Sequence, residues 1–280
     1  MSDLQNHDDH KPSEIAKLVE TAGVSKAHLP AAQMFVLAVL AGAFIGFGAA
    51  TYTMIMTGVD ANFGPARLLG GVGFALGLIL VIVGGAELFT GNALMVMAAV
   101  DRKIKIRQLL RNWVIVLVGN LVGAAGLAIA FGLSSLLEGP MGTTAVDIAA
   151  AKTTLSPLEA LVRGALCNAL VCLAVWLTFA ARSVTGKILS ILWPVAGFVL
   201  LGLEHSIANL FFFPFGWAAA ASATATTAAT ATAGDSLFAV IPLSGAVSNL
   251  FWVTLGNILG GAGGVALAYR FAFHGPGRSS

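Results

Sequence analysis

One histidine of the chain lies deep inside an apolar stretch. His205 stands between the charge-poor runs 188–203 and 206–221. The remaining histidines are near the chain ends or ahead of the first apolar run: His7, His10, His28 and His274. Ionisable side chains at membrane depth are costly and usually functional, and a free imidazole, with a pKa of about 6.5, exchanges a proton near neutral pH. His205 is therefore the main candidate for proton handling. A neutral ring bonded to a backbone carbonyl is the alternative.

The surroundings of His205 are repeated earlier in the chain. Residues 85–92 and 202–209 both read G-x-E-x-x-x-x-N, which makes Glu87 and Glu204 equivalent. Two later stretches, G-N-L-V-G and G-N-I-L-G, contain Asn120 and Asn257 at the same position. A weaker match, between residues 42–44 and 164–166, precedes both. Three matches in the same order indicate an internal duplication.

The composition is that of a polytopic membrane protein. Hydrophobic residues make up 58% of the 280 residues and charged residues only 10%, whereas soluble chains carry about 25% charged residues. The formal net charge of +2 is too small to favour nucleic-acid binding. The two cysteines, Cys167 and Cys172, cannot supply a zinc cage or a disulfide framework. We expect no metal, no cofactor and no nucleic acid.

A transmembrane helix needs about 20 apolar residues, and six segments approach this length. They are residues 29–59, 68–86 with a continuation to 100, 113–137, 164–181, 188–203 with a continuation to 221, and 237–269. The second and fifth are interrupted at Glu87 and Glu204. Residues 29–271 are thus expected to form the membrane domain. Residues 1–28 are a tail with a short amphipathic helix from Pro12, and residues 272–280 are a second tail.

An odd number of segments in each half makes the second half enter the membrane from the opposite side. The sequence therefore predicts an all-α fold of six transmembrane helices in an inverted 3+3 repeat, a design that builds sites from broken helices near the midplane. Backbone that leaves a helix inside a bilayer needs partners within the protein. We expect Glu87 and Glu204 to accept hydrogen bonds from the freed N–H groups. The repeat brings Thr90 near His205 at the pseudo-twofold axis.

The basic residues predict the orientation. With the N-terminus inside, twelve of the 15 lysines and arginines fall on the cytoplasmic side, and the other three are Arg67, Lys152 and Arg163. Positive charge is enriched in cytoplasmic loops, so both termini are expected in the cytoplasm, with the chain in the cytoplasmic (inner) membrane. Residues 218–234, nearly all Ala, Thr and Ser, are expected to be a flexible or loosely helical outer connector.

Three motifs resemble signatures of the formate/nitrite transporter family. They are E-L-F-T-G at 87–91, G-A-L-C-N-A-L-V-C-L-A-V-W at 164–176 and G-L-E-H-S-I-A-N at 202–209. The similarity extends over residues 29–269. It implies an aquaporin-like protomer, one pore in each subunit and a homopentamer in membrane lipid. Residues 151–154 and 252–257 look more like the nitrite branch than the formate branch.

The resemblance also implies roles for single residues. His205 matches the central pore histidine, and Thr90 is its partner. Asn168 and Asn257 would donate to substrate oxygens, although buried amides also join helices. Lys152, expected in an outer loop, would attract anions unless it is merely solvated. Two hydrophobic constrictions would be formed by Phe74, Leu78, Phe89 and Phe198.

These expectations combine into a transporter of small monovalent anions, nitrite first and formate second. A proton shared through His205 would link transport to pH. A formate or hydrosulfide channel of the same family is an alternative. A water or glycerol channel is disfavoured because paired Asn-Pro-Ala motifs are absent. An enzyme or redox subunit is disfavoured because the spans contain no pair of histidines for haem and no cysteine cluster.

Overall fold

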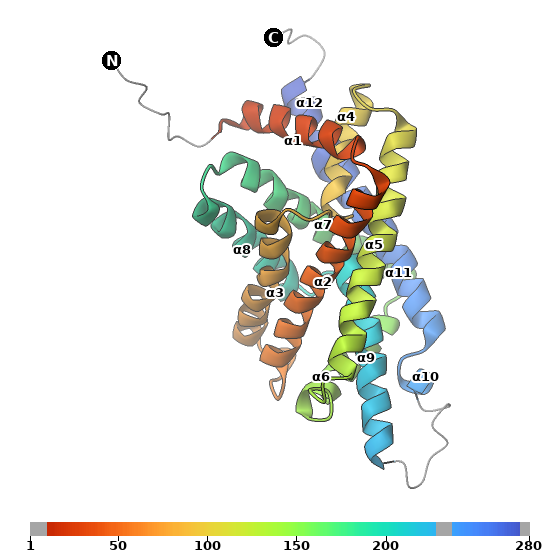
Figure 1. Ribbon diagram of the computed structural model, residues 1–280. Helices are drawn as coiled ribbons and strands as arrows, with labels where there is room; N and C mark the ends of the chain where they lie inside the picture. The colour runs from red at the N-terminus through yellow and green to blue at the C-terminus, as the bar shows by residue number, and fades with distance from the viewer. Residues whose placement is uncertain (1–9, 228–236, 275–280) are drawn as a thin grey trace.

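The computed structural model describes residues 10–227 and 237–274, and these residues form helices, turns and loops without strands. Residues 1–9 and 275–280 of the expected tails, and residues 228–234 of the expected connector, lie outside the described residues. The helices follow in chain order (Figure 1): α1 Pro12–Ala27, α2 Ala31–Met56, α3 Gly64–Gly84, the 3₁₀-helix η1 Gly91–Met95, α4 Val96–Val100, α5 Ile106–Gly132, α6 Pro140–Thr153, α7 Pro157–Ala180, α8 Val184–Leu200, α9 Ser206–Thr227, α10 Leu237–Val240, α11 Leu243–Ile258, the π-helix η2 Leu259–Leu267 and α12 Ala268–His274.

Five helical stretches are long and apolar enough to cross a membrane in the described part of the chain. They are Ala31–Met56, Gly64–Gly84, Ile106–Gly132, Pro157–Ala180 and Leu243–Phe273. Three shorter apolar stretches accompany them: Gly91–Val100, Val184–Leu200 and Ser206–Ser222. The protein is thus an all-helical, multi-pass membrane protein, and the expected fifth segment is divided between two shorter helices, α8 and α9.

Some boundaries differ from the sequence-based expectation. Lys152 lies in the last turn of α6, a helix that the sequence analysis took for a loop. The expected connector begins as helix, because α9 continues to Thr227. α7 begins at Pro157, well before the expected 164, since Ser156 and Glu159 cap its N-terminus reciprocally. Counting charge-free residues misses such a start, because a capping box is itself polar.

The two helix breaks coincide with glycines in the left-handed conformation. α3 ends at Gly84, Gly85 follows with φ of 81°, and η1 begins at Gly91. α8 ends at Leu200, and Gly202 follows with φ of 68° before α9 begins at Ser206. Glycine adopts this conformation without steric cost from a Cβ atom. Each break therefore sits just ahead of its motif glutamate.

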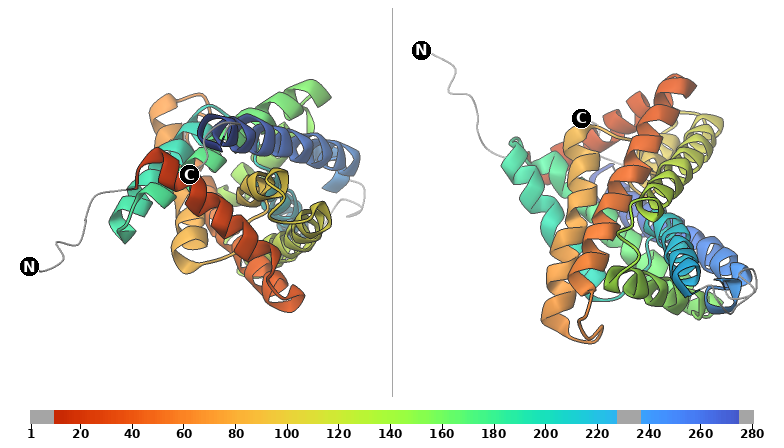
Figure 2. Two further views of the ribbon diagram at one scale, coloured as in Figure 1. Left: turned by 90° about the horizontal axis from the view of Figure 1, so that it is seen from above. Right: turned by 60° about the horizontal axis from the view of Figure 1, so that its bottom comes forward.

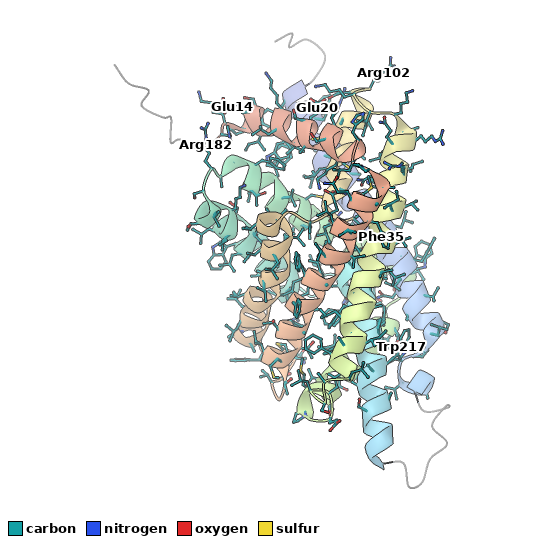
Figure 3. The ribbon with its side chains drawn as sticks, in the orientation of Figure 1. Glu14, Glu20, Phe35, Arg102, Arg182 and Trp217 are labelled. Carbon is teal, nitrogen blue, oxygen red and sulfur yellow. The ribbon has the colours of Figure 1, made fainter. Side chains whose placement is uncertain are left out.

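Helix α1 lies across one end of the bundle, where α4 and α12 are also found (Figure 1), and Figure 2 shows the same arrangement from above. Its buried side, which includes Ile15 and Val19, packs on η1, α4 and α7. The Lys11 backbone N–H donates to the Glu14 carboxylate and, together with His10, holds the pKa of Glu14 below its ordinary value. The predicted amphipathic helix thus covers one end of the helix bundle (Figure 1). Figure 3 places Glu14, Glu20, Arg102 and Arg182 at this end.

Glycines allow neighbouring helices to approach closely. α2 packs between α3 and α5, and α7 packs between α8 and α11. A Cβ atom on Gly123 of α5 would overlap the Val39 carbonyl oxygen of α2, and one on Gly260 of η2 would overlap the Ala165 carbonyl oxygen of α7. Such small-residue contacts replace the hydrophobic driving force that lipid does not supply between helices.

The α2–α5 contact can be tested with Gly123→Ala. The new Cβ forces the two backbones apart, and overpacking of this kind costs about 1–3 kcal/mol. We expect a lower unfolding temperature in detergent, measured by thermal shift. The matched control is Gly126→Ala on the same helix, where no atom lies within 4 Å of the added Cβ. It gains the same helix propensity, so equal unfolding temperatures for the two variants would contradict the close contact.

Candidate functional site

His205 and Thr90 form a buried hydrogen-bonded pair between the two breaks. The Nε2 atom of His205 lies 2.9 Å from the Thr90 hydroxyl oxygen, and the Ala208 backbone N–H donates to Nδ1 over 3.1 Å. His205 is 3% exposed and Thr90 is 1% exposed. The pair joins residue 90, just before η1, to the start of α9. The structure therefore brings together the two central residues that the sequence singled out.

The two hydrogen bonds of His205 determine its resting tautomer. Nδ1 accepts from an amide and carries no proton, so the proton of a neutral ring resides on Nε2. The Nε2–H group then donates to the Thr90 oxygen, and the Thr90 hydroxyl proton is left to donate elsewhere. A doubly protonated ring would direct an Nδ1–H group at the Ala208 N–H. The site thus offers a neutral donor at rest, and the cationic ring would have to give up the bond to Ala208.

Asparagine side chains hold the freed backbone of both breaks. Asn120 accepts from the Phe89 N–H over 3.0 Å and donates to the carbonyl oxygens of Ala38 and Glu87. Asn257 accepts from the Ser206 N–H over 2.9 Å. It donates to the carbonyl oxygens of Gly164 and Glu204. The same three-bond clamp therefore occurs twice, from α5 and from α11.

The expectation that Glu87 and Glu204 would accept from these N–H groups is wrong. Their carboxylates instead accept from lysines, Lys26 at 2.6 Å and Lys152 at 2.8 Å. Each also accepts from an asparagine, and the motif pairs Glu87 with Asn92 and Glu204 with Asn209 at 2.7 Å. A buried carboxylate needs an opposite charge more than an amide donor, and an asparagine side chain can satisfy both N–H and C=O groups of the broken backbone.

Asn168 and Asn257, the two asparagines predicted to donate to the substrate, have no unbonded side-chain N–H group. Both N–H groups of the Asn257 side chain are used within the clamp, so its expected role as a donor to substrate oxygens is not supported. Asn168 donates to the carbonyl oxygens of Thr90 and Asn257, at 3.2 and 2.6 Å. Its side-chain oxygen is buried without a hydrogen-bond partner. Both amides therefore hold the centre together, which is the alternative role that buried amides commonly have.

Two cavities approach the centre from different directions. The Lys152 cavity, with a volume of about 1080 Å³, is lined by Lys152, Glu204 and His205 among others. The Lys26 cavity, of about 340 Å³, is lined by Lys26, Glu87 and Gly91 among others. Lys152 is not a solvated loop residue, since its side chain is only 14% exposed. The three basic residues that the sequence set apart, Arg67, Lys152 and Arg163, all line the first cavity.

The partition between the cavities is apolar and about one helical turn thick. On α3, Phe74 lines the Lys152 cavity and Leu78, four residues further, lines the Lys26 cavity. The ring of Phe74 meets Phe198 edge-on at 5.6 Å, and Phe198 stacks on His205 at 6.0 Å. Three of the four expected constriction residues therefore line a cavity.

Phe89 is the exception among the expected constriction residues. It lines neither cavity, and its ring packs against Trp113 at 6.0 Å. Leu88 lines the Lys26 cavity in its place, together with Val175. The backbone between the break and η1 is not helical, so a helical spacing from Thr90 does not predict which of the two neighbouring side chains faces the cavity.

The sequence analysis missed a second pair of asparagines. Asn92 donates to the side-chain oxygen of Asn112, and Asn209 donates to that of Asn249, at 2.9 and 2.8 Å. The spacing could have identified them, because Asn112 and Asn249 each precede a clamp asparagine by eight residues. Lys26 is among the twelve basic residues of the predicted cytoplasmic side, and no motif signalled its contact with Glu87.

The chain is similar to known channels along most of its length. A model of the family described as "Formate/nitrite transporter" matches residues 13–271. The formate channel FocA of Escherichia coli (strain K12) is 39% identical over 263 residues, which cover 92% of each chain. The uncharacterized transporter YrhG of Bacillus subtilis (strain 168) is 38% identical over 273 residues, which cover 96% of each chain.

The fold of the chain is also similar to solved channel structures. A structure described as an FNT family ion channel superimposes with a TM-score of 0.81 at 30% identity, covering 93% of this chain and 99% of that one. A pentameric formate channel with formate bound superimposes with a TM-score of 0.78 at 38% identity, covering 87% of this chain and 98% of that one.

The asparagine clamp can be tested with Asn257→Ala. The substitution leaves the Ser206 N–H and the Glu204 carbonyl group at the break without these partners, and each such buried group costs about 1–3 kcal/mol. We expect an unfolding temperature several degrees lower, and Asn120→Ala should behave alike. Asn62→Ala, at an exposed position, is the control. A change no larger than that of Asn62→Ala would contradict the clamp.

Proposed function

The chain belongs to the formate/nitrite transporter family, whose members are channels and transporters rather than enzymes, and we propose that it conducts small monovalent anions across the cytoplasmic membrane. The observation that carries this proposal is the pair of cavities. Both approach the buried His205–Thr90 pair, and a partition about one helical turn thick separates them. An anion of three non-hydrogen atoms needs only a short opening there.

The partition sets the energetic problem for such a pore. A bare anion loses its hydration between Phe74, Phe198 and Leu78, and an unpaired charge in an apolar medium is very unfavourable. The Thr90 hydroxyl proton and the Nε2–H of His205, once it turns from the Thr90 oxygen to the anion, are the polar donors at this level. They replace part of the lost hydration without binding a charged ligand so tightly that it cannot leave.

Protons accompany the anion in this proposal. When His205 takes up a second proton and its bond to Ala208 opens, the ring can hand a proton to the anion and neutralise it. Neutralisation removes most of the desolvation cost. Flux then rises as the pH falls, because the transfer begins from the doubly protonated ring.

The duplicated clamps support an inverted repeat as the architecture of the pore. In this proposal residues 29–271 form six transmembrane units in two aquaporin-like halves, with α3 and α8 as the first parts of the broken helices. Five protomers assemble, as in the pentameric formate channel to which the chain is similar. Both termini lie in the cytoplasm, so the Lys26 cavity opens inward and the Lys152 cavity outward.

We place formate ahead of nitrite as the substrate. The named relatives include formate channels at 39% identity, and the pentameric channel at 38% identity holds formate. Formate and nitrite both have three non-hydrogen atoms in a bent arrangement with two terminal oxygens, so the two donors at the partition serve either. The nitrite preference read from residues 151–154 and 252–257 stays a prediction that flux measurements decide.

The substrate class can be tested with purified protein in liposomes. We expect formate and nitrite to enter at saturable rates well above those of protein-free liposomes, with formate favoured. Glycerol should enter no faster than in the absence of protein. Stopped-flow light scattering measures all three. Glycerol permeation without anion permeation would replace the proposal by a neutral-solute channel.

The role of His205 can be tested with two substitutions. His205→Gln keeps an amide donor near the Nε2 position but cannot titrate, whereas His205→Phe removes both properties. We expect His205→Phe to lower formate flux about tenfold or more at every pH, since a buried hydrogen bond to a charged group contributes about 1.5–3 kcal/mol. His205→Gln should carry formate with a flattened dependence on pH.

Flux of the two variants is measured between pH 5 and pH 8 with equal pH on both sides. Thr51→Val, on α2 away from both cavities, is the control. A His205→Gln variant with the wild-type pH profile would remove the proton-transfer step and leave His205 as a hydrogen-bond donor only.

A further inference from the structure

In each cavity the positive charge of the lysine is largely balanced by a neighbouring glutamate. Lys152 is paired with Glu204 at 2.8 Å and Lys26 with Glu87 at 2.6 Å. The glutamates are 6% and 7% exposed. Opposite charges at contact distance form a dipole whose field falls off rapidly. An anion that approaches from solvent is therefore attracted mainly by whatever cations at the mouths are not paired.

Arg67 is such a cation in the Lys152 cavity. It is the fourth residue of α3, is partly buried and lines the cavity. No carboxylate lies within 4 Å of it among the residues that the structure describes. Its one hydrogen bond runs to the Val199 carbonyl oxygen at 3.4 Å, and its guanidinium lies against Gly202, at the break. Most of its five N–H donors are available to a ligand.

Lys187 has the corresponding position in the Lys26 cavity. It is the fourth residue of α8, is partly buried and lines the cavity beside Thr178 and Phe179. Its ammonium group also has no carboxylate within 4 Å in the described ranges. Each mouth thus combines a lysine–glutamate pair next to the break of one half with an unpaired cation from the first turn of the other half's broken helix.

Other charges do not cancel this arrangement. Arg163 also lines the Lys152 cavity, but it lies 3.9 Å from Glu159. Glu138 and Asp147 line the same cavity and are exposed, so solvent screens them. Arg67 lies at the helix break and not at the rim of the cavity, because its guanidinium contacts Gly202, two residues before Glu204. It is therefore the cation that an anion meets directly before the partition.

We propose that Arg67 and Lys187 are the anion-capture residues of the two mouths, one for each side of the membrane. The proposal rests on the anion-channel function and adds the residues that determine its apparent affinity. Captured anions would be small and carry a carboxylate-like pair of oxygens, which the planar guanidinium of Arg67 can bind in a bidentate manner.

Concentration dependence of formate influx, measured separately from each side, tests the proposal. The protein is inserted in one orientation, confirmed by protease access to an N-terminal tag, with equal pH and no voltage. A passive pore must have the same ratio of maximal rate to KM in both directions, so the informative quantity is the half-saturating concentration on each side. We expect Arg67→Gln to raise it about three- to tenfold on the Lys152 side only. Lys187→Gln should raise it on the Lys26 side only.

The two variants are matched controls for one another. Lys17→Gln, at an exposed position of α1, controls for the loss of a basic residue outside the cavities. Arg67→Lys keeps the charge but not the bidentate geometry, so its half-saturating concentration should lie between those of the wild type and Arg67→Gln. The effects should shrink at high salt. An unchanged half-saturating concentration in both variants would overturn the proposal. So would equal increases for Arg67→Gln and Arg67→Lys, which would assign Arg67 to holding the Val199 backbone. Absence of formate and nitrite flux in the wild type would instead refute the anion-channel function itself.

Discussion

Breaking a helix inside a bilayer is possible only if the freed backbone groups find partners in the protein. Asn120 and Asn257 meet this requirement, each joining one N–H and one carbonyl group of a break to a carbonyl group of a neighbouring helix. The clamps permit the chain to turn at Gly85 and Gly202. Because they consume the polar groups of the backbone, the side chains at the centre remain free for substrate. The position of His205 follows from this constraint, since it lies one residue after the break carbonyl that Asn257 holds.

The duplicated framework surrounds a centre that is not duplicated. Aligning Glu87 with Glu204 places Leu88 opposite His205 and Thr90 opposite Ile207. The glutamates, lysines and asparagines around the breaks keep equivalent hydrogen bonds, whereas the central positions pair an apolar residue with a polar one. A symmetric frame thus supplies the geometry, and a single imidazole–hydroxyl pair supplies the chemistry. Two imidazoles at van der Waals distance would repel one another once protonated, which a single ring avoids.

The sequence predicted the helix breaks and the central pair because both leave local signals: a glycine, a glutamate and an asparagine at fixed spacing, and a lone histidine in an apolar run. It did not predict which groups would satisfy one another across the fold. The lysine partners of Glu87 and Glu204 come from 61 and 52 residues away, and no local pattern specifies such a contact. It also did not predict that Phe89 would line neither cavity, because facing directions in a non-helical turn do not follow a period.

The lysine–glutamate pairs explain how a path for anions can contain buried carboxylates. Each glutamate orders an asparagine of its own motif, and that asparagine bonds to a second one on α5 or α11. A carboxylate in this place would repel an anion if it were alone, and a lysine alone would hold the anion too tightly. Removing one partner of a buried pair is costly because it leaves an uncompensated charge. Pairing them therefore stabilises the break and leaves the cavity wall near neutral, as conduction requires, since a conducted ion must be able to leave as well as bind.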